Sequence, residues 1–248
     1  MAHQRQNRAL IIVNSIFYGK ENHLENRQGA EREANKLFIA LSNCNYAVQL
    51  HHNLTVTEIV TLYEKECQEN HGDYFVSIIS SHGDEGIIYD CEGQPVQLTQ
   101  IYQALSPQRC HNLAGKPKIF FIQACRGEEI DPGVETDGAA PQINCFSHYS
   151  AIPEDTAVMF ACSPGYASFI NRWESMFLKV LLRFLEGEER HLELTSFVTR
   201  INFEVAYNCQ ARGRYGGGKE MPCFVTKMVR GMCPFSQRRQ ALGHSRVL

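Results

Sequence analysis

Short apolar runs alternate along the chain with segments whose apolar residues recur at helical spacing. An apolar run of about four to eight residues between polar boundaries is typical of a buried strand. The predicted strands are Ala9–Phe17, Tyr46–Leu50, Tyr74–Ser80, Lys118–Gln123, Ala157–Cys162 and Cys223–Val229. The predicted helices are Gly29–Leu41, Thr55–Cys67, a short segment from Thr99, Glu174–Glu186 and His191–Asn208. This alternation indicates βαβ units, so we expect an α/β fold whose central, mostly parallel six-stranded sheet is flanked by helices.

Three connections have signals of their own. Thr55 and Glu58 have the spacing of a capping box, which marks the start of a helix. Gly86–Leu98 is typical of a small hairpin. Gly127–Pro153 is rich in Gly, Pro, Glu and Asp, shows little periodicity and is too long for an ordinary connection. We therefore expect a linker or a mobile loop over that last range.

Composition narrows the classes of function. The chain has 248 residues, of which 44% are hydrophobic and 21% charged, enough for an ordinary globular core. A formal charge of −3 argues against binding to nucleic acid or a membrane surface through bulk charge. No run in the sequence approaches the length of a membrane span. The first residues are polar and basic with no separate apolar stretch, so we expect no signal peptide. The ten cysteines include no Cys-x-x-Cys pair, so we expect reduced thiols, no metal site and a cytoplasmic or nuclear location.

Polar turns follow two of the predicted strands. Tyr74–Ser80 leads into His82 and Gly83, and Lys118–Gln123 leads into Cys125. Because neighbouring parallel strands end at the edge of the sheet where ligands bind, we expect His82 and Cys125 to lie side by side. An isolated cysteine is more often a packing residue, but a thiol beside an imidazole can become a nucleophile. The backbone N–H groups of Gly83 and Cys125 would then supply an oxyanion hole.

The segment Gln123-Ala-Cys-Arg-Gly127 matches the nucleophile signature of the caspases, which has a histidine about 50 residues upstream. Further matches in the family's order are Ser81–Gly83, Gly115–Lys118, Val134–Asp137, Ser163–Tyr166 and Met221–Phe224. The chain thus resembles an executioner-like caspase with a short or absent prodomain. The resemblance implies a three-layer fold and a cysteine endopeptidase that cleaves after aspartate without a cofactor. It makes Cys125 the nucleophile, His82 the proton carrier and Gly83 part of the oxyanion hole.

The resemblance also implies a basic pocket for the aspartate of the substrate. Arg27 and Gln123 would line one side of it, because arginine binds a carboxylate through two parallel hydrogen bonds. Taken alone, Arg27 would pass as a solvated loop charge and Gln123 as an ordinary residue at the end of a strand.

The other side of the pocket departs from the family's Ser-aromatic-Arg pattern. Ser168 and Phe169 match, but the arginine position holds Ile170. Arg172 lies two residues on, and in an extended loop residues i and i+2 face the same side, so a slip of two residues would bring it into the pocket. Without that cation, binding of the substrate carboxylate would weaken by about 2–5 kcal/mol. Ala167 replaces a common aromatic residue, which suggests a less well-formed neighbouring subsite.

The resemblance further divides the chain. Residues 1–137 correspond to a large subunit region with the catalytic pair, and residues 138–230 to a small one. Residues 128–153 form the processing linker, in which an upstream caspase would cut after Asp137 and so activate a zymogen. The polar, basic tail of residues 231–248 is expected to be disordered. The implied assembly is a homodimer of large and small subunit pairs, joined near Cys223–Val229.

Three functions compete at this point. The first is the aspartate-directed endopeptidase, with protein substrates and a role in apoptosis or differentiation-linked proteolysis. The second is a catalytically weak relative that regulates active caspases by pairing with them, which Ile170 and Ala167 favour. The third is a thiol redox protein, which would need a resolving cysteine next to Cys125 in sequence, and none is there.

Overall fold

The computed structural model describes residues 5–18, 24–127, 151–168, 170–171, 174–210 and 217–236. Within these residues, no helix is long and apolar enough to cross a membrane.

A six-stranded sheet forms the centre of the molecule, with the strand order β11-β8-β7-β3-β1-β2. Its strands are β1 (Asn7–Val13), β2 (Tyr46–His52), β3 (Phe75–Ser80), β7 (Lys118–Gln123), β8 (Thr156–Phe160) and β11 (Cys223–Thr226). All neighbours pair in parallel except β11, which runs antiparallel to β8. The prediction of a mostly parallel six-stranded sheet is therefore confirmed.

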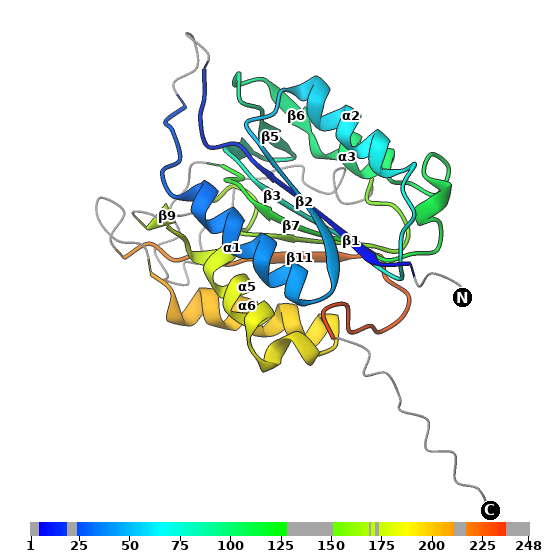
Figure 1. Ribbon diagram of the computed structural model, residues 1–248. Coiled ribbons are helices and arrows are strands. Elements are labelled where there is room, and N and C mark those ends of the chain that lie inside the picture. Colours follow the sequence, from blue (N-terminus) through cyan, green and yellow to red (C-terminus); the bar gives the residue numbers. More distant parts are fainter. Residues whose placement is uncertain are drawn as a thin grey trace, which may run out of the picture.

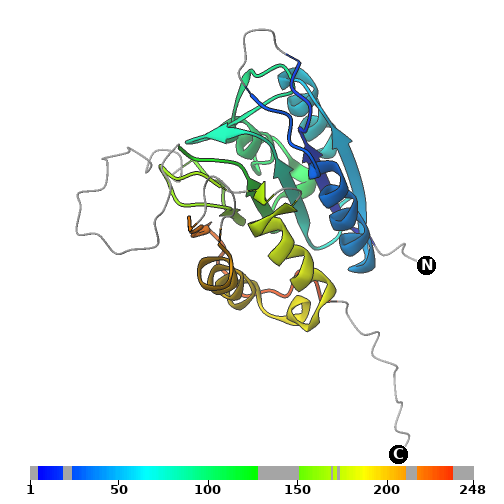
Figure 2. The same cartoon turned by 90° about the vertical axis from the view of Figure 1, so that its left-hand side faces the viewer.

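Helices cover both faces of this sheet, which gives three layers (Figures 1 and 2). One face carries α1 (Ala30–Asn43), α5 (Met176–Glu186) and α6 (Leu194–Asn208), and the other carries α2 (Val56–Glu66) and α3 (Leu98–Ala104). Strand β7 shows why both faces need cover, because its side chains alternate between the two cores. Ile119 and Phe121 join the first core, and Phe120 and Ile122 join the second.

Helix starts follow local capping chemistry. At the start of α2, the side chain of Glu58 accepts hydrogen bonds from Thr55, and the N–H of Glu58 donates to Thr55 Oγ1 at 3.4 Å, so the predicted capping box is confirmed. Helix α6 begins at Leu194 rather than His191, because the side chain of Glu193 accepts the N–H of Thr195 at 2.8 Å. Residues Glu188–His191 form a separate 3-10 turn.

Short strands outside the central sheet follow the carboxyl ends of its parallel strands. The predicted hairpin is confirmed as β5 (Ile87–Tyr89) and β6 (Pro95–Gln97), and β4 (Gly83–Asp84) adds a third strand to it. A two-stranded ribbon, β9 (Ile170–Asn171) and β10 (Glu174–Ser175), follows β8. Because Glu174 and Ser175 belong to this ribbon, α5 starts two residues later than the sequence predicts.

The expectation of a disordered tail from residue 231 is wrong for its first part. Phe235 is 1% exposed and stacks near Phe197, with ring centroids 5.1 Å apart. Tyr46 donates its hydroxyl hydrogen to the carbonyl of Pro234 at 2.8 Å. Met232 is also buried in the same core. Two apolar anchors thus hold residues 231–236 against the α1 and α6 layer, while residues 237–248 lie outside the described residues.

Candidate active site

The catalytic candidates follow two neighbouring strands at matching positions. Strands β3 and β7 pair in parallel, with Ser80 opposite Gln123. His82 and Cys125 each lie two residues beyond this pair, on the turns that leave the same edge of the sheet. The backbone bond from Ser81 N–H to the Gln123 carbonyl, at 3.1 Å, continues the pairing past the strand ends. The two turns are therefore neighbours, as the sequence predicts.

Cys125 has a half-buried thiol at the rim of the sheet. Its Sγ lies 3.7 Å from both the carbonyl oxygen and the Oγ of Ser168, in the segment after β8. Gly83 packs against the same turn, because a Cβ at that position would lie 2.9 Å from Ala124 Cβ and 3.2 Å from the Cys125 carbonyl oxygen. Only glycine lets the turn after β3 approach the backbone of the nucleophile so closely.

His82 is held by a backbone carbonyl. Its Nε2 lies 2.7 Å from the carbonyl oxygen of Glu25, and its ring packs near Phe17 with centroids 4.8 Å apart. Since a carbonyl can only accept, Nε2 carries the hydrogen, and Nδ1 is the acceptor nitrogen of the neutral ring. Burial lowers the pKa of His82, and the charge of Arg27 lowers it further. The ring is therefore poised as a neutral base.

Arg27 is a buried cation at the same edge. It is 6% exposed, and its guanidinium donates to the Asn14 carbonyl at 3.0 Å and to Ser80 Oγ at 2.9 Å. Burial lowers the pKa of Arg27 to about 10, so it remains charged at neutral pH. Among the described residues, no carboxylate lies within ion-pair distance of this guanidinium. Its charge is thus only partly satisfied, although it is removed from water.

Gln123 completes this side of the site. It is 1% exposed and donates through Nε2 to Ser168 Oγ at 3.0 Å. Its Oε1 is buried and has no hydrogen-bond partner among the described residues. Of the predicted pocket residues, the structure thus brings together Arg27, Gln123 and Ser168 around Cys125.

The remaining predicted residues are not placed. Phe169, Arg172 and Asp137 lie outside the described residues, and of Ile170 only the backbone is described, in β9.

The turn after Cys125 is fixed by Arg126 and Gly127. Arg126 is 3% exposed, forms an ion pair with Glu85 at 2.7 Å, and lies 4.2 Å from the ring centroid of Phe160. Gly127 has a φ of 151°, and a Cβ there would collide with the backbone of Gly165. The Arg-Gly pair of the signature therefore fixes the nucleophile turn to the turn after β4 and to the segment after β8.

Some contributors were not predicted from the sequence. The Glu25 carbonyl could not be found, because every residue has a carbonyl. Ser80 offered a signal, since it ends a predicted strand beside His82. No group of three or more His, Cys, Asp or Glu side chains in the described part of the chain is arranged to hold a metal ion.

Comparison with known proteins agrees with this geometry. The Caspase domain family matches residues 6–233. Caspase-7 of Gallus gallus is 31% identical over 93% of this chain and 77% of the chicken protein. Caspase-3 of Felis catus is 34% identical over 89% of this chain and 81% of the cat protein.

A solved structure shows the same fold. Caspase-1 from Spodoptera frugiperda superimposes with a TM-score of 0.81 at 22% identity, over 94% of this chain and 93% of that one. Together, the family match, the relatives and the thiol–imidazole edge show that the chain belongs to the caspase family of cysteine peptidases.

Proposed function

We propose that the protein is an endopeptidase that cleaves peptide bonds after aspartate. One observation carries the proposal: Arg27 is a buried cation with no carboxylate partner among the described residues, at the edge that holds Cys125 and His82. A buried charge in this state favours an anionic ligand, and the planar guanidinium suits a carboxylate. An aspartate that enters there would place its own carbonyl near the thiol.

The chemical steps follow from the hydrogen-bonding roles. The Cys125 sulfur attacks the carbonyl carbon as its proton passes to Nδ1 of His82, the acceptor nitrogen. The N–H groups of Gly83 and Cys125 stabilise the oxyanion. The imidazolium then protonates the leaving amine, and the C–N bond breaks. A water molecule gives a proton to His82 as its oxygen attacks the thioester carbon. The C–S bond then breaks, the sulfur takes the proton back from the imidazolium, and the acid product leaves.

Gln123 supports recognition of the aspartate. In the free protein Nε2 donates to Ser168 Oγ and Oε1 has no partner among the described residues. When substrate binds, a rotation of the amide would turn the NH₂ group toward the carboxylate and let Oε1 accept the Ser168 hydroxyl hydrogen. The substrate carboxylate would then receive hydrogen bonds from Arg27 and Gln123.

The central test uses the full chain and a peptide reporter with aspartate before the scissile bond. Cys125→Ala is expected to abolish cleavage, because no other group can form the acyl-enzyme. Cys233→Ala, which removes an exposed thiol, is the matched control and should leave the rate unchanged. Cleavage that survives in Cys125→Ala would exclude the mechanism, and equal rates for aspartate and asparagine reporters would exclude the pocket.

A regulatory protein that pairs with active caspases is the second candidate. Ile170, where the family has a pocket arginine, favours it, and the intact Cys125 and His82 favour the enzyme. Ile170→Arg separates the two. A gain of about tenfold or more in cleavage of the aspartyl reporter would show that the natural pocket is weak. An unchanged rate would show that Arg172 already acts there.

Maturation and assembly belong to the same proposal. An upstream caspase cuts after Asp137, and processed chains pair through β11, which the sheet order places at an edge. The resulting dimer would act on protein substrates in the cytoplasm or nucleus, in apoptosis or differentiation-linked proteolysis. Asp137→Ala should keep the linker uncut at that bond when the chain is incubated with an active executioner caspase. Mass spectrometry of the products would reveal a cut there, which would contradict the assignment.

A further inference from the structure

Hydrogen bonds hold Ser168, which precedes the β9–β10 ribbon, and Ser175, which ends it. At one end, Ser168 Oγ accepts from Gln123 of β7. At the other end, Ser175 is bonded to Glu33 of α1. Gln123 and Glu33 belong to the large subunit region, and the two serines belong to the small one. The β9–β10 ribbon between them is therefore positioned by residues on the far side of the processing linker.

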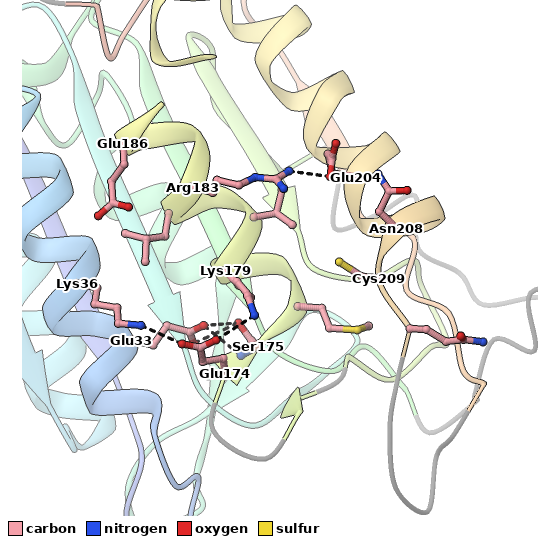
Figure 3. Close-up of a pocket in the computed structure, with 14 residues that line it drawn as sticks. Glu33, Lys36, Glu174, Ser175, Lys179, Arg183, Glu186, Glu204, Asn208 and Cys209 are labelled. Carbon is pink, nitrogen blue, oxygen red and sulfur yellow. Dashed lines mark hydrogen bonds and ion pairs between the residues drawn. The ribbon is translucent and has the colours of Figure 1, made fainter. Parts of the chain in front are cut away.

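The bond between Glu33 and Ser175 is deeply buried. Glu33 is 4% exposed and Ser175 is 1% exposed. The backbone N–H of Ser175 donates to Glu33 Oε1 at 3.1 Å, and its hydroxyl donates to the same carboxylate at 3.1 and 3.2 Å. Ser175 also caps α5, because its Oγ accepts the N–H of Leu178 at 3.1 Å. One carboxylate thus fixes both the end of the ribbon and the start of the helix (Figure 3).

The ribbon transmits this position to the aspartate pocket. In the antiparallel pairing of β9 and β10, Ser175 lies opposite Ile170. Position 170 is where the family carries its pocket arginine, two residues after Ser168. Arg27 lies just before α1, and Glu33 lies in the first turn of that helix. The start of α1 therefore brings together Arg27, the cation of the pocket, and Glu33, which bonds to the ribbon on the other side of the pocket.

The neighbouring carboxylate has a different environment. Glu174 lies 2.9 Å from Lys36 and 3.2 Å from Lys179, and it is partly exposed beside a cavity of about 640 Å³ between α1, α5 and α6 (Figure 3). Exposed ion pairs of this kind contribute little and are screened by salt. The buried acceptor at Glu33 is therefore the stronger constraint on the ribbon.

We propose that Glu33 is a positioning residue for the aspartate pocket: through Ser175 it sets the place of the β9–β10 ribbon opposite Arg27. The proposal rests on the proposed function, since it concerns the same pocket. Glu33 touches neither the thiol nor the substrate. Its loss should weaken recognition of aspartate and leave the reactivity of Cys125 unchanged.

Burial raises the pKa of Glu33 to about 7, although hydrogen bonds from Ser175 and the charge of Arg27 oppose the shift. The nearby charge of Glu174, itself paired with Lys36 and Lys179, raises it further. Ionising this buried carboxylate costs the fold stability. This is the pattern expected of a group retained for the site.

The experiment compares two labelling rates on the full chain, with and without linker cleavage. The first reagent is an aspartyl fluoromethyl ketone, which needs the pocket, and the second is iodoacetamide, which needs only the thiol. We expect Glu33→Ala to lower the ratio of aspartyl to iodoacetamide labelling at Cys125 about tenfold. Glu33→Gln retains an acceptor for the Ser175 N–H and should stay within about threefold of the natural protein. Glu186→Ala, at the distant end of the same cavity in Figure 3, is the matched control and should change nothing.

A ratio that Glu33→Ala leaves unchanged would overturn the inference, and so would an equal loss in Glu33→Gln. Should Glu33→Ala fail to fold, Ser175→Ala removes the hydroxyl bonds alone and should lower the ratio by a smaller factor; no change there would also overturn it. Failure of the proposed function has a separate signature. The natural chain would then label equally with aspartyl and asparaginyl reagents.

Discussion

The two walls of the proposed aspartate pocket are built differently. One wall is formed by Ser80 and Gln123, which end β3 and β7, and by Arg27, which is hydrogen-bonded to Ser80. All three residues are buried. The other wall contains β9 and β10, two strands of two residues each. The first wall has the rigidity of the central sheet, whereas the second depends on a few hydrogen bonds. The departure from the family pattern, Ile170, falls on the second wall.

The largest effect is expected when Arg27, the cation of the wall built on the central sheet, is replaced. Arg27→Met keeps an apolar stem and removes the charge, so the substrate carboxylate loses its partner. We expect kcat/KM for the aspartyl reporter to fall by about 2–5 kcal/mol, or tens- to thousands-fold. The control is Arg32→Met, which removes an exposed cation from the first turn of α1, and it should have little effect. A loss of less than about threefold in Arg27→Met would mean that another group receives the aspartate.

A second test concerns the contact between the two walls. Gly127 packs on the backbone of Gly165, where the nucleophile turn meets the segment after β8. Gly127→Ala should lower the free energy of unfolding by about 2–3 kcal/mol, because the methyl group collides and φ is positive. Gly115→Ala is the matched control, since Gly115 also has a positive φ, 67°, but a Cβ there meets nothing within 4 Å. Equal losses in urea unfolding would show that backbone strain alone matters.

The smallest expected effect concerns two neighbouring carboxylates and pH. The pKa of Glu33 is raised to about 7, so its ionisation opposes folding as pH rises from about 4.5 to 7. Glu33→Gln should therefore add about 2 kcal/mol to the free energy of unfolding at pH 8, and much less at pH 5.

Glu174 provides the opposite case, because hydrogen bonds from Lys36 and Lys179 lower its pKa to about 2. Its ionised form favours folding, and that contribution is lost as pH falls from about 4.5 to 2. Glu174→Gln should cost less than about 1 kcal/mol at pH 8, because the pairs are partly exposed. Urea unfolding at several pH values checks both variants. A Glu33→Gln variant that is less stable than the natural protein at pH 8 would contradict the assignment.

The parts of the fold that follow from local pattern could be predicted. Strands β1, β3 and β7 are apolar on both faces, and that pattern together with intervening helices requires a covered parallel sheet. His82 and Cys125 were predictable because each follows such a strand. The boundaries of α5 and α6 were less accurate, since they depend on the side chains of Ser175 and Glu193, which compete with the apolar periodicity.

Contacts between distant segments could not be predicted. The Glu25 carbonyl beside His82 and the partners of Arg27 are set by how β1 and β3 pair, and no residue type signals them. Glu33 resembled any polar residue on an amphipathic helix, yet it is buried against Ser175. The packing of residues 231–236 could not be predicted either, because their few apolar residues lead into a polar tail and nothing local signals that Phe235 lies among aromatic rings.

Phe235 has a practical consequence for work with this chain. Its ring lies near those of Tyr46, Phe121 and Phe197, which come from β2, β7 and α6. One side chain near the end of the described chain therefore packs against three separate elements. A truncation at residue 230 would leave a cavity lined by aromatic rings and an exposed apolar surface. Such a protein would be prone to aggregate before its activity could be assayed. Shortened versions should keep residue 236, and an affinity tag at this end should follow it through a flexible spacer.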